Sequence, residues 1–302
     1  MSEILIHEVG PRDGLQMEKQ VVPSEKKLEW IRALMASGLD IIQVGSFVHP
    51  ERMPQMADTD ELFRILGQGP QRATLSGLVL NEKGLERALE VGVQLICMGV
   101  SASETHSRKN TGMVTEEATR RIIATALEGK QAGRKVQVSV QSAFGCGFEG
   151  AIPEARVMGI VAAYLEAGLT SISLADTAGH AHPDQVRRYV QAVLALDPAA
   201  EVTAHIHDTY GLGMASVYAA MEAGARAIET SFGGLGGCPF TKVAAGNVAT
   251  EDLVHGLQRM GQRLDIDLAA LIGVTRDVAA CFGRELPGCV YKTGPITTKA
   301  LA

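Results

Sequence analysis

The chain has 302 residues, of which 46% are hydrophobic and 21% charged, and its 28 Lys and Arg against 34 Asp and Glu leave a formal charge of −6. This composition fits a folded globular protein and excludes disordered, collagen-like and low-complexity chains. The acidic balance, with no Lys/Arg-rich run, argues against nucleic acid and anionic membranes as partners, so an enzyme acting on a small molecule becomes the leading class.

In chain order, the first recurring element is a joint between a helix and a strand. A helical segment ends in glycine, and an isoleucine follows four positions later inside a β-branched run. Glycine ends a helix readily because it adopts the left-handed conformation without a Cβ clash. Four copies of this joint predict a repeating βα architecture. The joints are Gly38 to Ile42, Gly92 to Ile96, Gly168 to Ile172 and Gly224 to Ile228.

Eight short apolar runs separated by helical patterns predict a parallel sheet, and eight strands close naturally into an α/β (β/α)₈ TIM barrel. A doubly wound open sheet is the alternative, but no strand is followed by Gly-x-Gly-x-x-Gly. We expect one catalytic domain over residues 1–302, with a C-terminal helical extension from about residue 255. The expected strands are residues 4–9, 41–46, 73–79, 95–100, 136–142, 171–175, 201–207 and 226–231.

The N-terminal segment lacks the basic and apolar regions of a secretory signal, and no stretch approaches the roughly 20 apolar residues of a membrane span. The five cysteines are odd in number, far apart and without a Cys-x-x-Cys pair, which argues against disulfides and structural zinc. We therefore expect a cytoplasmic protein. Four of the five are expected to be packing or surface thiols, namely Cys97, Cys146, Cys281 and Cys289.

Reactive groups of such barrels lie where the strands end and in the loops that follow. Several polar residues fall at these positions and should meet at one rim of the barrel. They are Arg12 and Asp13 after the first strand, Gln43 and Ser46 at the second, Asp176 after the sixth, His205 and His207 at the seventh, and Cys238 after the eighth.

Two histidines at i and i+2 on a strand, His205 and His207, point to the same face and can bind one cation. A pair of hydrogen-bonded barrel histidines explains the pattern equally well. With Asp13 and an amide such as Asn247, the donor set suits Mg²⁺ or Mn²⁺, although mixed nitrogen and oxygen sites also take Zn²⁺ or Co²⁺. The other histidines are expected in loop, surface or packing roles, namely His7, His49, His106, His180, His182 and His255.

The segment GGLGGCPF (233–240) surrounds Cys238 with glycines, so it can approach a ligand closely, and a nearby cation would make the thiol reactive. Arg12 can bind a carboxylate or polarise a carbonyl oxygen. Its alternative is a surface arginine in a turn. Lys19 and Lys242 could meet a phosphate-bearing tail, but solvated surface is the better-supported role for both.

These residues lie in motifs that resemble the 3-hydroxy-3-methylglutaryl-CoA lyase family of metal-dependent TIM barrels. The resemblance spans most of the chain, and its Cys238 loop favours cleavage over the condensation of related synthases. It implies an acyl-CoA substrate split into acetyl-CoA and acetoacetate, a possible homodimer, and a Mg²⁺ or Mn²⁺ cofactor. The motifs are EVGPRDGLQ (8–16), SFVHPERMPQMAD (46–58), ISLADTAG (172–179), HIHDTYGLGMAS (205–216) and GGLGGCPF (233–240) with AAGNVATEDL (244–253).

The resemblance also implies roles for individual residues. Asp13, His205, His207 and Asn247 would coordinate the cation, Arg12 would stabilise the enolate-like oxygen, and Cys238 would work with His205 in proton transfer. The residues expected to bind substrate or support the site are Gln16, Lys19, Gln43, Ser46, Ser173, Asp176 and Asp252, the last beside Glu251.

Two positions depart from the family pattern. Gln43 stands where the family usually has Glu, so a carboxylate is replaced by a neutral amide. Lys242 stands where the family has a small or neutral residue. These departures keep three alternatives open, which are a related 3-hydroxyacyl-CoA lyase, an aldolase and a catalytically weak metal-binding paralogue. The pathway also stays open between leucine breakdown and another branched-acid route.

Overall fold

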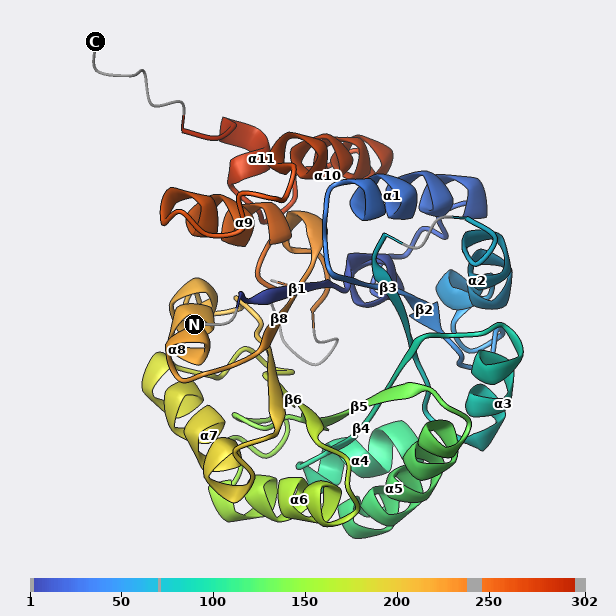
Figure 1. Cartoon of the computed structure of the whole chain (residues 1–302), viewed down its shortest axis with the longest axis vertical. Helices are drawn as coiled ribbons and strands as arrows, with labels where there is room; N and C mark the ends of the chain where they lie inside the picture. The colour runs from blue at the N-terminus through green and yellow to red at the C-terminus, as the bar shows by residue number, and fades with distance from the viewer. Residues whose placement is uncertain (1–2, 70–71, 238–245, 297–302) are drawn as a thin grey trace.

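The computed structural model describes residues 3–69, 72–237 and 246–296. Eight parallel strands form a closed barrel in sequence order, with the first strand paired to the last (Figure 1), as predicted. The strands are β1 (Leu5–Glu8), β2 (Ile41–Ser46), β3 (Thr74–Leu78), β4 (Leu95–Ser101), β5 (Lys135–Gln141), β6 (Ser171–Ala175), β7 (Glu201–His205) and β8 (Ala227–Thr230).

Helices surround the barrel and connect each strand to the next (Figure 1). Short helical turns lie in the connections between strands and helices. The turn η1 (Gly10–Gly14) is a π-turn, and η2 (Pro54–Met56) and η3 (Phe232–Gly234) are 3₁₀ turns. The helices are α1 (Ser24–Ala36), α2 (Thr59–Leu66), α3 (Glu82–Glu90), α4 (Glu104–Thr111), α5 (Thr115–Gln131), α6 (Glu154–Glu166), α7 (Pro183–Leu196), α8 (Gly213–Glu222), α9 (Thr250–Arg259), α10 (Leu268–Phe282) and α11 (Val290–Thr293).

The glycine joints predicted from the sequence have the expected backbone conformation. The φ angles of Gly38, Gly92, Gly168 and Gly224 are +95°, +76°, +74° and +104°, a region that other residues rarely adopt. Each glycine therefore turns the chain from a helix directly into the next strand. Because all eight strands run the same way, every strand delivers its carboxyl end to one rim of the barrel.

The main hydrophobic core fills the space between the strands and the helices. In α7 the apolar positions at helical spacing, Val186, Tyr189, Val190 and Val193, are all buried. Such a stripe buries one face of each helix against the sheet and supplies most of its stability. Parts of the barrel interior, in contrast, hold polar side chains, and these form the site described below.

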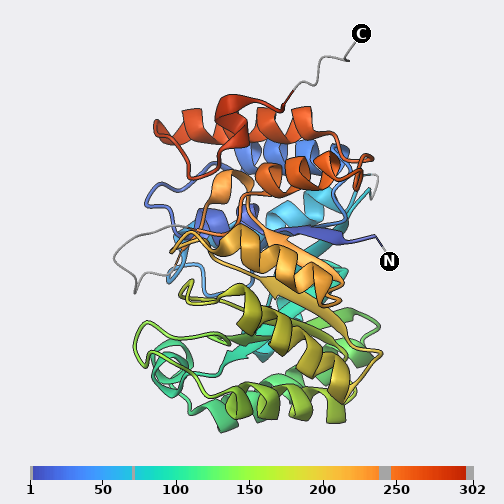
Figure 2. The ribbon, with the colours of Figure 1, turned by 90° about the vertical axis from the view of Figure 1, so that its left-hand side faces the viewer.

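Helices α10 and α11 follow the barrel and pack at one end of the molecule beside α1 and α9 (Figure 2). The buried Trp30 of α1 donates from Nε1 to Asp277 Oδ2 of α10 at 2.6 Å, which ties the extension to the barrel. The expected boundary near residue 255 falls inside α9, which is the helix after β8, and the next helix begins at Leu268. No helix among the described residues has the length and apolar character to cross a membrane.

One strand boundary differs from the prediction. Strand β7 ends at His205, two residues before His207. Residues 206 and 207 leave the barrel ladder because they pair with the segment after residue 246 instead: Val248 N donates to Ile206 O, and His207 forms an antiparallel bridge with Asn247. The segment from 246 to 249 is thereby held over the rim.

Candidate active site

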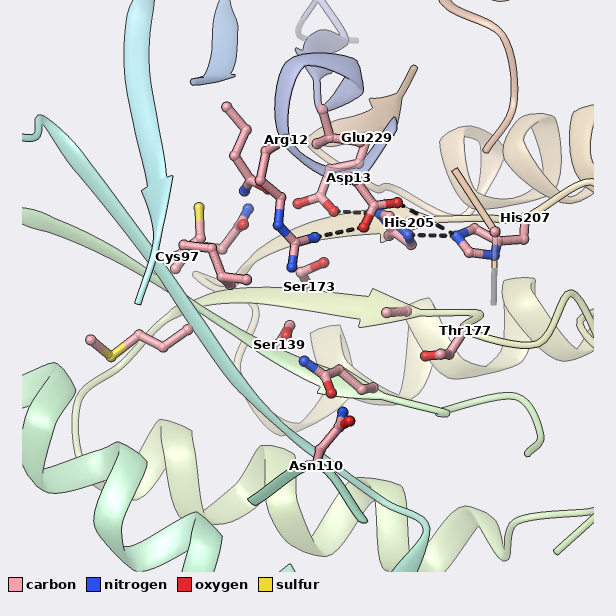
Figure 3. Close-up of a pocket in the computed structure, with 18 of the residues that line it drawn as sticks. Arg12, Asp13, Cys97, Asn110, Ser139, Ser173, Thr177, His205, His207 and Glu229 are labelled. Atoms are coloured by element: carbon pink, nitrogen blue, oxygen red, sulfur yellow. Dashed lines mark hydrogen bonds and ion pairs between the residues drawn. The ribbon is translucent and has the colours of Figure 1, made fainter. Parts of the chain in front are cut away.

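Three side chains that could ligate a metal meet at the carboxyl rim of the barrel (Figure 3). Asp13 lies in η1, His205 ends β7, and His207 follows two residues later. Their ligand atoms all lie within 4.8 Å of one another. His205 Nε2 is 3.0 Å from His207 Nε2, which in turn is 3.9 Å from Asp13 Oδ2. The sequence-based prediction that these residues converge therefore agrees with the geometry.

The protonation states suit a cation. His205 Nδ1 lies 2.8 Å from Glu229 Oε2, and because a carboxylate only accepts, we assign a proton to Nδ1. Burial opposes the charged ring, but Glu229 raises the pKa of His205, so Nε2 is the atom at which a cation would replace a proton. Burial is the largest cause that lowers the pKa of His207 to about 4, so its ring is neutral. Burial opposes ionisation of Asp13, but Arg12, the two histidines and the Asn247 hydrogen bond together outweigh it and lower the pKa of Asp13.

Asn247 completes the cluster. Its Nδ2 donates to Asp13 Oδ2 at 2.8 Å and to Leu235 O at 3.0 Å. Its Oδ1 is buried and has no hydrogen-bond partner among the described residues. Gly236 packs closely against Asn247 and Asp13, with a φ angle of +113°. A Cβ at this position would lie 2.5 Å from Asn247 Nδ2 and 3.1 Å from Asp13 Oδ2. A free amide oxygen beside one carboxylate and two imidazoles fits a divalent cation.

Arg12 lies beside these ligands with Nη1 donating to Asp13 Oδ1 at 2.6 Å. Its Nε is buried and has no hydrogen-bond partner among the described residues. The side chain is therefore fixed at one end and has a donor left for a substrate oxygen. This position rules out the alternative of a surface arginine.

The cluster opens into a cavity of about 170 Å³ in the barrel mouth. Figure 3 shows Arg12, Asp13, Glu229, His205 and His207 grouped on one side, with Cys97, Ser139, Ser173, Thr177 and Asn110 around the rest. The lining residues are Val9, Arg12, Asp13, Gln43, Leu78, Cys97, Met98, His106, Asn110, Gln137, Ser139, Gln141, Ser173, Ala175, Thr177, His205, His207, Glu229 and Gly237.

Of the residues predicted to bind substrate or support the site, some line this cavity and others lie behind it. Gln43 and Ser173 line it, and Ser173 Oγ is buried without a hydrogen-bond partner among the described residues. Asp176 does not line it but shapes the loop after β6, where it accepts the N–H groups of residues 180 and 181 at 2.8 and 3.1 Å. Burial raises the pKa of Asp176 to about 6. Ser46 is buried outside the cavity and contacts Thr59 of α2.

Other predicted residues lie away from the cavity formed by the described residues. Lys19 is exposed, and Gln16 is half-buried in the segment after η1. Asp252 faces the extension, where it accepts the N–H groups of Cys289 and Val290 at 2.8 and 2.7 Å. It therefore fixes the start of α11 and does not reach the cation cluster. Cys238 and Lys242 lie outside the described residues.

Three side chains expected from the sequence to have packing or surface roles are buried in the interior. His7 is fully buried, with Nε2 2.8 Å from Ser76 Oγ, and it approaches Glu229. His106 is buried and lines the cavity. Cys97 lines it as well, and burial raises the pKa of its thiol to about 12, so the thiol stays protonated. For His7 on β1 and Cys97 on β4 the available signal was strand alternation, which sends every second side chain into the barrel.

Two buried carboxyl groups support the loop around η3. Glu8 Oε1 accepts the N–H groups of Gly10 and Phe232 at 2.6 and 3.0 Å, and Oε2 accepts the Thr250 hydroxyl at 2.6 Å. Glu251 Oε2 accepts the N–H of Gly233 at 3.1 Å. Burial raises the pKa of Glu8 to about 7 and that of Glu251 to about 8. These acids hold the loop from behind and do not line the cavity.

Comparison with known proteins identifies the family. The HMGL-like family model matches residues 3–278. The hydroxymethylglutaryl-CoA lyase YngG of Bacillus subtilis is 36% identical over 94% of this chain and 95% of its own length. The (R)-citramalyl-CoA lyase of Chloroflexus aurantiacus is 37% identical over 98% of this chain and 96% of its own.

A solved structure of an HMG-CoA lyase from Acinetobacter baumannii, in complex with coenzyme A and 3-methylmalate, is 39% identical. It superposes with a TM-score of 0.92 over 98% of this chain and 96% of that one. Family model, relatives and solved structure each cover most of this chain. The chain therefore belongs to the HMGL-like family, and it is a carbon–carbon lyase.

Proposed function

We propose that this chain is a divalent-cation-dependent lyase that splits 3-hydroxy-3-methylglutaryl-CoA into acetyl-CoA and acetoacetate. The observation that carries the proposal is the meeting of Asp13, His205 and His207 beside Arg12 at one cavity. The name of the Bacillus subtilis relative supports this substrate. The cavity volume of about 170 Å³ suits the acyl end of a thioester, because pockets for drug-sized ligands start at about 300 Å³.

The reaction breaks the bond between C2 and C3 of the acyl chain. The 3-hydroxyl loses its proton to a base, and its oxygen becomes the ketone oxygen of acetoacetate. The bonding electrons remain on C2 as the enolate of acetyl-CoA, which then takes up a proton. When bound by Asp13, His205, His207 and Asn247, Mg²⁺ or Mn²⁺ would polarise the hydroxyl and lower its pKa.

Arg12 would stabilise the negative charge that develops on the thioester oxygen. Its position is fixed by the 2.6 Å bond to Asp13, and its buried Nε remains available. A donor held in place before the charge appears needs no rearrangement during the reaction, which is why such groups lower barriers effectively. The shielded barrel mouth strengthens the interaction because it lowers the local dielectric.

Cys238 is our proposed proton donor to C2, with His205 taking part in proton transfer. The support comes from the sequence: Cys238 directly follows Gly237, which lines the cavity, and lies in a glycine-rich segment that can approach a ligand. A thiol is suited to this step because its ordinary pKa lies near neutrality.

Cleavage of (R)-citramalyl-CoA is a second candidate, supported by the 37% identical Chloroflexus aurantiacus relative. That thioester carries its carboxylate directly on the tertiary carbon, so its cleavage yields acetyl-CoA and pyruvate. The cavity wall is rich in uncharged amides, which can accommodate a carboxylate through hydrogen bonds without a further positive charge. These amides belong to Gln43, Asn110, Gln137 and Gln141.

The test offers both thioesters to purified chain that has been stripped with a chelator and reloaded with Mg²⁺ or Mn²⁺. We expect acetyl-CoA and acetoacetate from 3-hydroxy-3-methylglutaryl-CoA, and no product from stripped enzyme. Faster release of pyruvate from (R)-citramalyl-CoA would select the second candidate. Absence of acetyl-CoA from the first thioester with either cation would refute the leading proposal.

A further inference from the structure

A carboxylate of the barrel interior lies directly behind the cation ligands. Glu229 is on β8, and the strand register places it opposite His205 of β7 on one side and His7 of β1 on the other. Figure 3 shows Glu229 next to His205 at the edge of the cavity. The three side chains therefore occupy one layer of the barrel across the point where it closes.

The contacts in this layer form a continuous series. Glu229 Oε2 lies 2.8 Å from His205 Nδ1, within hydrogen-bond distance. Oε1 lies 3.4 Å from His7 Nδ1, an electrostatic contact that does not have hydrogen-bond geometry. On its other side His7 Nε2 lies 2.8 Å from Ser76 Oγ. His7 and Ser76 are fully buried and Glu229 nearly so, which leaves these rings and the carboxylate little freedom to reorient.

The donors and acceptors can be assigned from chemistry. The carboxylate accepts from His205 Nδ1, which leaves Nε2 as the ring nitrogen that faces His207 Nε2 at 3.0 Å. If the Ser76 hydroxyl donates to His7 Nε2, the His7 proton is on Nδ1 and faces the carboxylate. In this arrangement each oxygen of Glu229 faces the Nδ1–H group of one histidine.

Charge makes the position of Glu229 important. Among the described residues that line the cavity, the carboxylates are Asp13 and Glu229, while Gln43 contributes only a neutral amide. Asp13 already contacts Arg12 and Asn247. Glu229 is therefore the carboxylate that orients a histidine.

We propose that Glu229 and His7 are positioning residues for the cation site: Glu229 fixes the tautomer and ring orientation of His205, and His7 acts through Glu229. This inference rests on the cation site of the proposed function. Mutation of a residue that hydrogen-bonds to a metal ligand typically weakens metal binding about 10- to 100-fold. His7, one contact further away, should have a smaller effect.

The test measures Mn²⁺ affinity by calorimetry on full-length protein stripped with a chelator, without any substrate. Glu229→Gln keeps the side-chain shape, and we expect it to weaken Mn²⁺ binding about 10- to 100-fold. His7→Leu should weaken binding less, and His7→Gln, which keeps an N–H donor, should restore it. In the Glu229→Gln background, His7→Leu should weaken Mn²⁺ binding by no more than about a further twofold, because its effect passes through the carboxylate.

A matched control is Thr203→Val. Thr203 lies on β7 two residues before His205, is buried, and accepts from Gln137 Nε2 at 3.0 Å without touching the cation cluster. This variant should lower the thermal midpoint and leave Mn²⁺ affinity unchanged. The visible spectrum of Co²⁺-loaded protein adds a second measurement, because a reoriented His205 shifts it and a general loss of stability does not.

The outcomes separate the two proposals. If the wild type binds no Mn²⁺, the cation site itself is refuted. If the wild type binds Mn²⁺ and Glu229→Gln and His7→Leu bind it equally well, or if the two variants act additively, only the positioning inference is overturned. Should Glu229→Gln fail to fold, the comparison of His7→Leu with His7→Gln still decides whether His7 acts on the site.

Discussion

The buried acid Glu251 should make the stability of the fold depend on pH. It is fully buried, its Oε1 has no hydrogen-bond partner among the described residues, and burial raises its pKa from 4.5 to about 8. Between these two values the folded chain holds a proton that the unfolded chain releases. Rising pH therefore favours the unfolded chain, and stability falls over this interval.

The magnitude follows from the shift. Each pH unit in the interval removes about 1.4 kcal/mol, so Glu251 removes about 3 kcal/mol between pH 5 and pH 7. For a protein of this size, 1 kcal/mol corresponds to about 2 °C in the thermal midpoint, which predicts a relative change of about 6 °C. Glu251→Gln can still accept the Gly233 N–H but cannot ionise. Its advantage over the wild type should therefore grow by this amount from pH 5 to pH 7.

The assay compares thermal midpoints of the wild type and Glu251→Gln at pH 5, 6 and 7 in a chelating buffer of constant ionic strength. The chelator is needed because cation binding depends on pH by itself. Glu90→Gln, which removes an exposed carboxylate paired with Arg64, serves as the control and should parallel the wild type. If the Glu251→Gln midpoints also ran parallel to the wild type, the carboxyl would be ionised in the fold and the reasoning refuted.

Three other predictions test separate parts of the structure. Arg12→Lys should lower kcat about 100- to 1,000-fold with little change in Mn²⁺ affinity, because one donor to the developing charge is lost. Steady-state kinetics would measure kcat and calorimetry the Mn²⁺ affinity. An unchanged kcat would remove Arg12 from the mechanism. Iodoacetamide at pH 8 should alkylate the exposed Cys289 and spare the buried Cys97, whose pKa is about 12, and mass spectrometry of peptides would show the reverse if the cavity thiol were ionised. Trp30→Phe should cost about 1–3 kcal/mol in urea unfolding because the bond to Asp277 is lost, whereas an unchanged midpoint would mean that the extension does not depend on it.

Local signals in the sequence explain why the barrel was predicted accurately. A glycine joint and a β-branched run determine their own backbone conformation within about ten residues, so each strand boundary could be placed within one or two positions. The end of β7 was the largest difference. Ile206 and His207 have strand-like sequence but pair with residues 247 and 248, a contact that local pattern does not reveal.

The site was predicted where its residues directly follow strands, and missed where it depends on contacts across the barrel. Asp13, His205 and His207 could be found because polar groups after strands share one rim. Glu229 and His7 could not, because their pairing depends on β8 closing against β1. Asp252 was misplaced for a related reason: it follows Glu251 by one residue on α9, and neighbouring helix positions point in different directions.

The closure of the barrel explains why both ends of the chain are needed at one site. Asp13 contacts Asn247, Glu8 contacts Thr250, and His7 contacts Glu229, so three layers of side chains cross the seam between β1 and β8. Each contact joins residues more than 200 positions apart in the sequence. A cation held by Asp13 on one side of the seam and by His205 on the other would bind only when the seam is closed. Cation binding and closure of the β1–β8 seam must therefore stabilise each other, because a ligand that binds only the closed form shifts the equilibrium toward it.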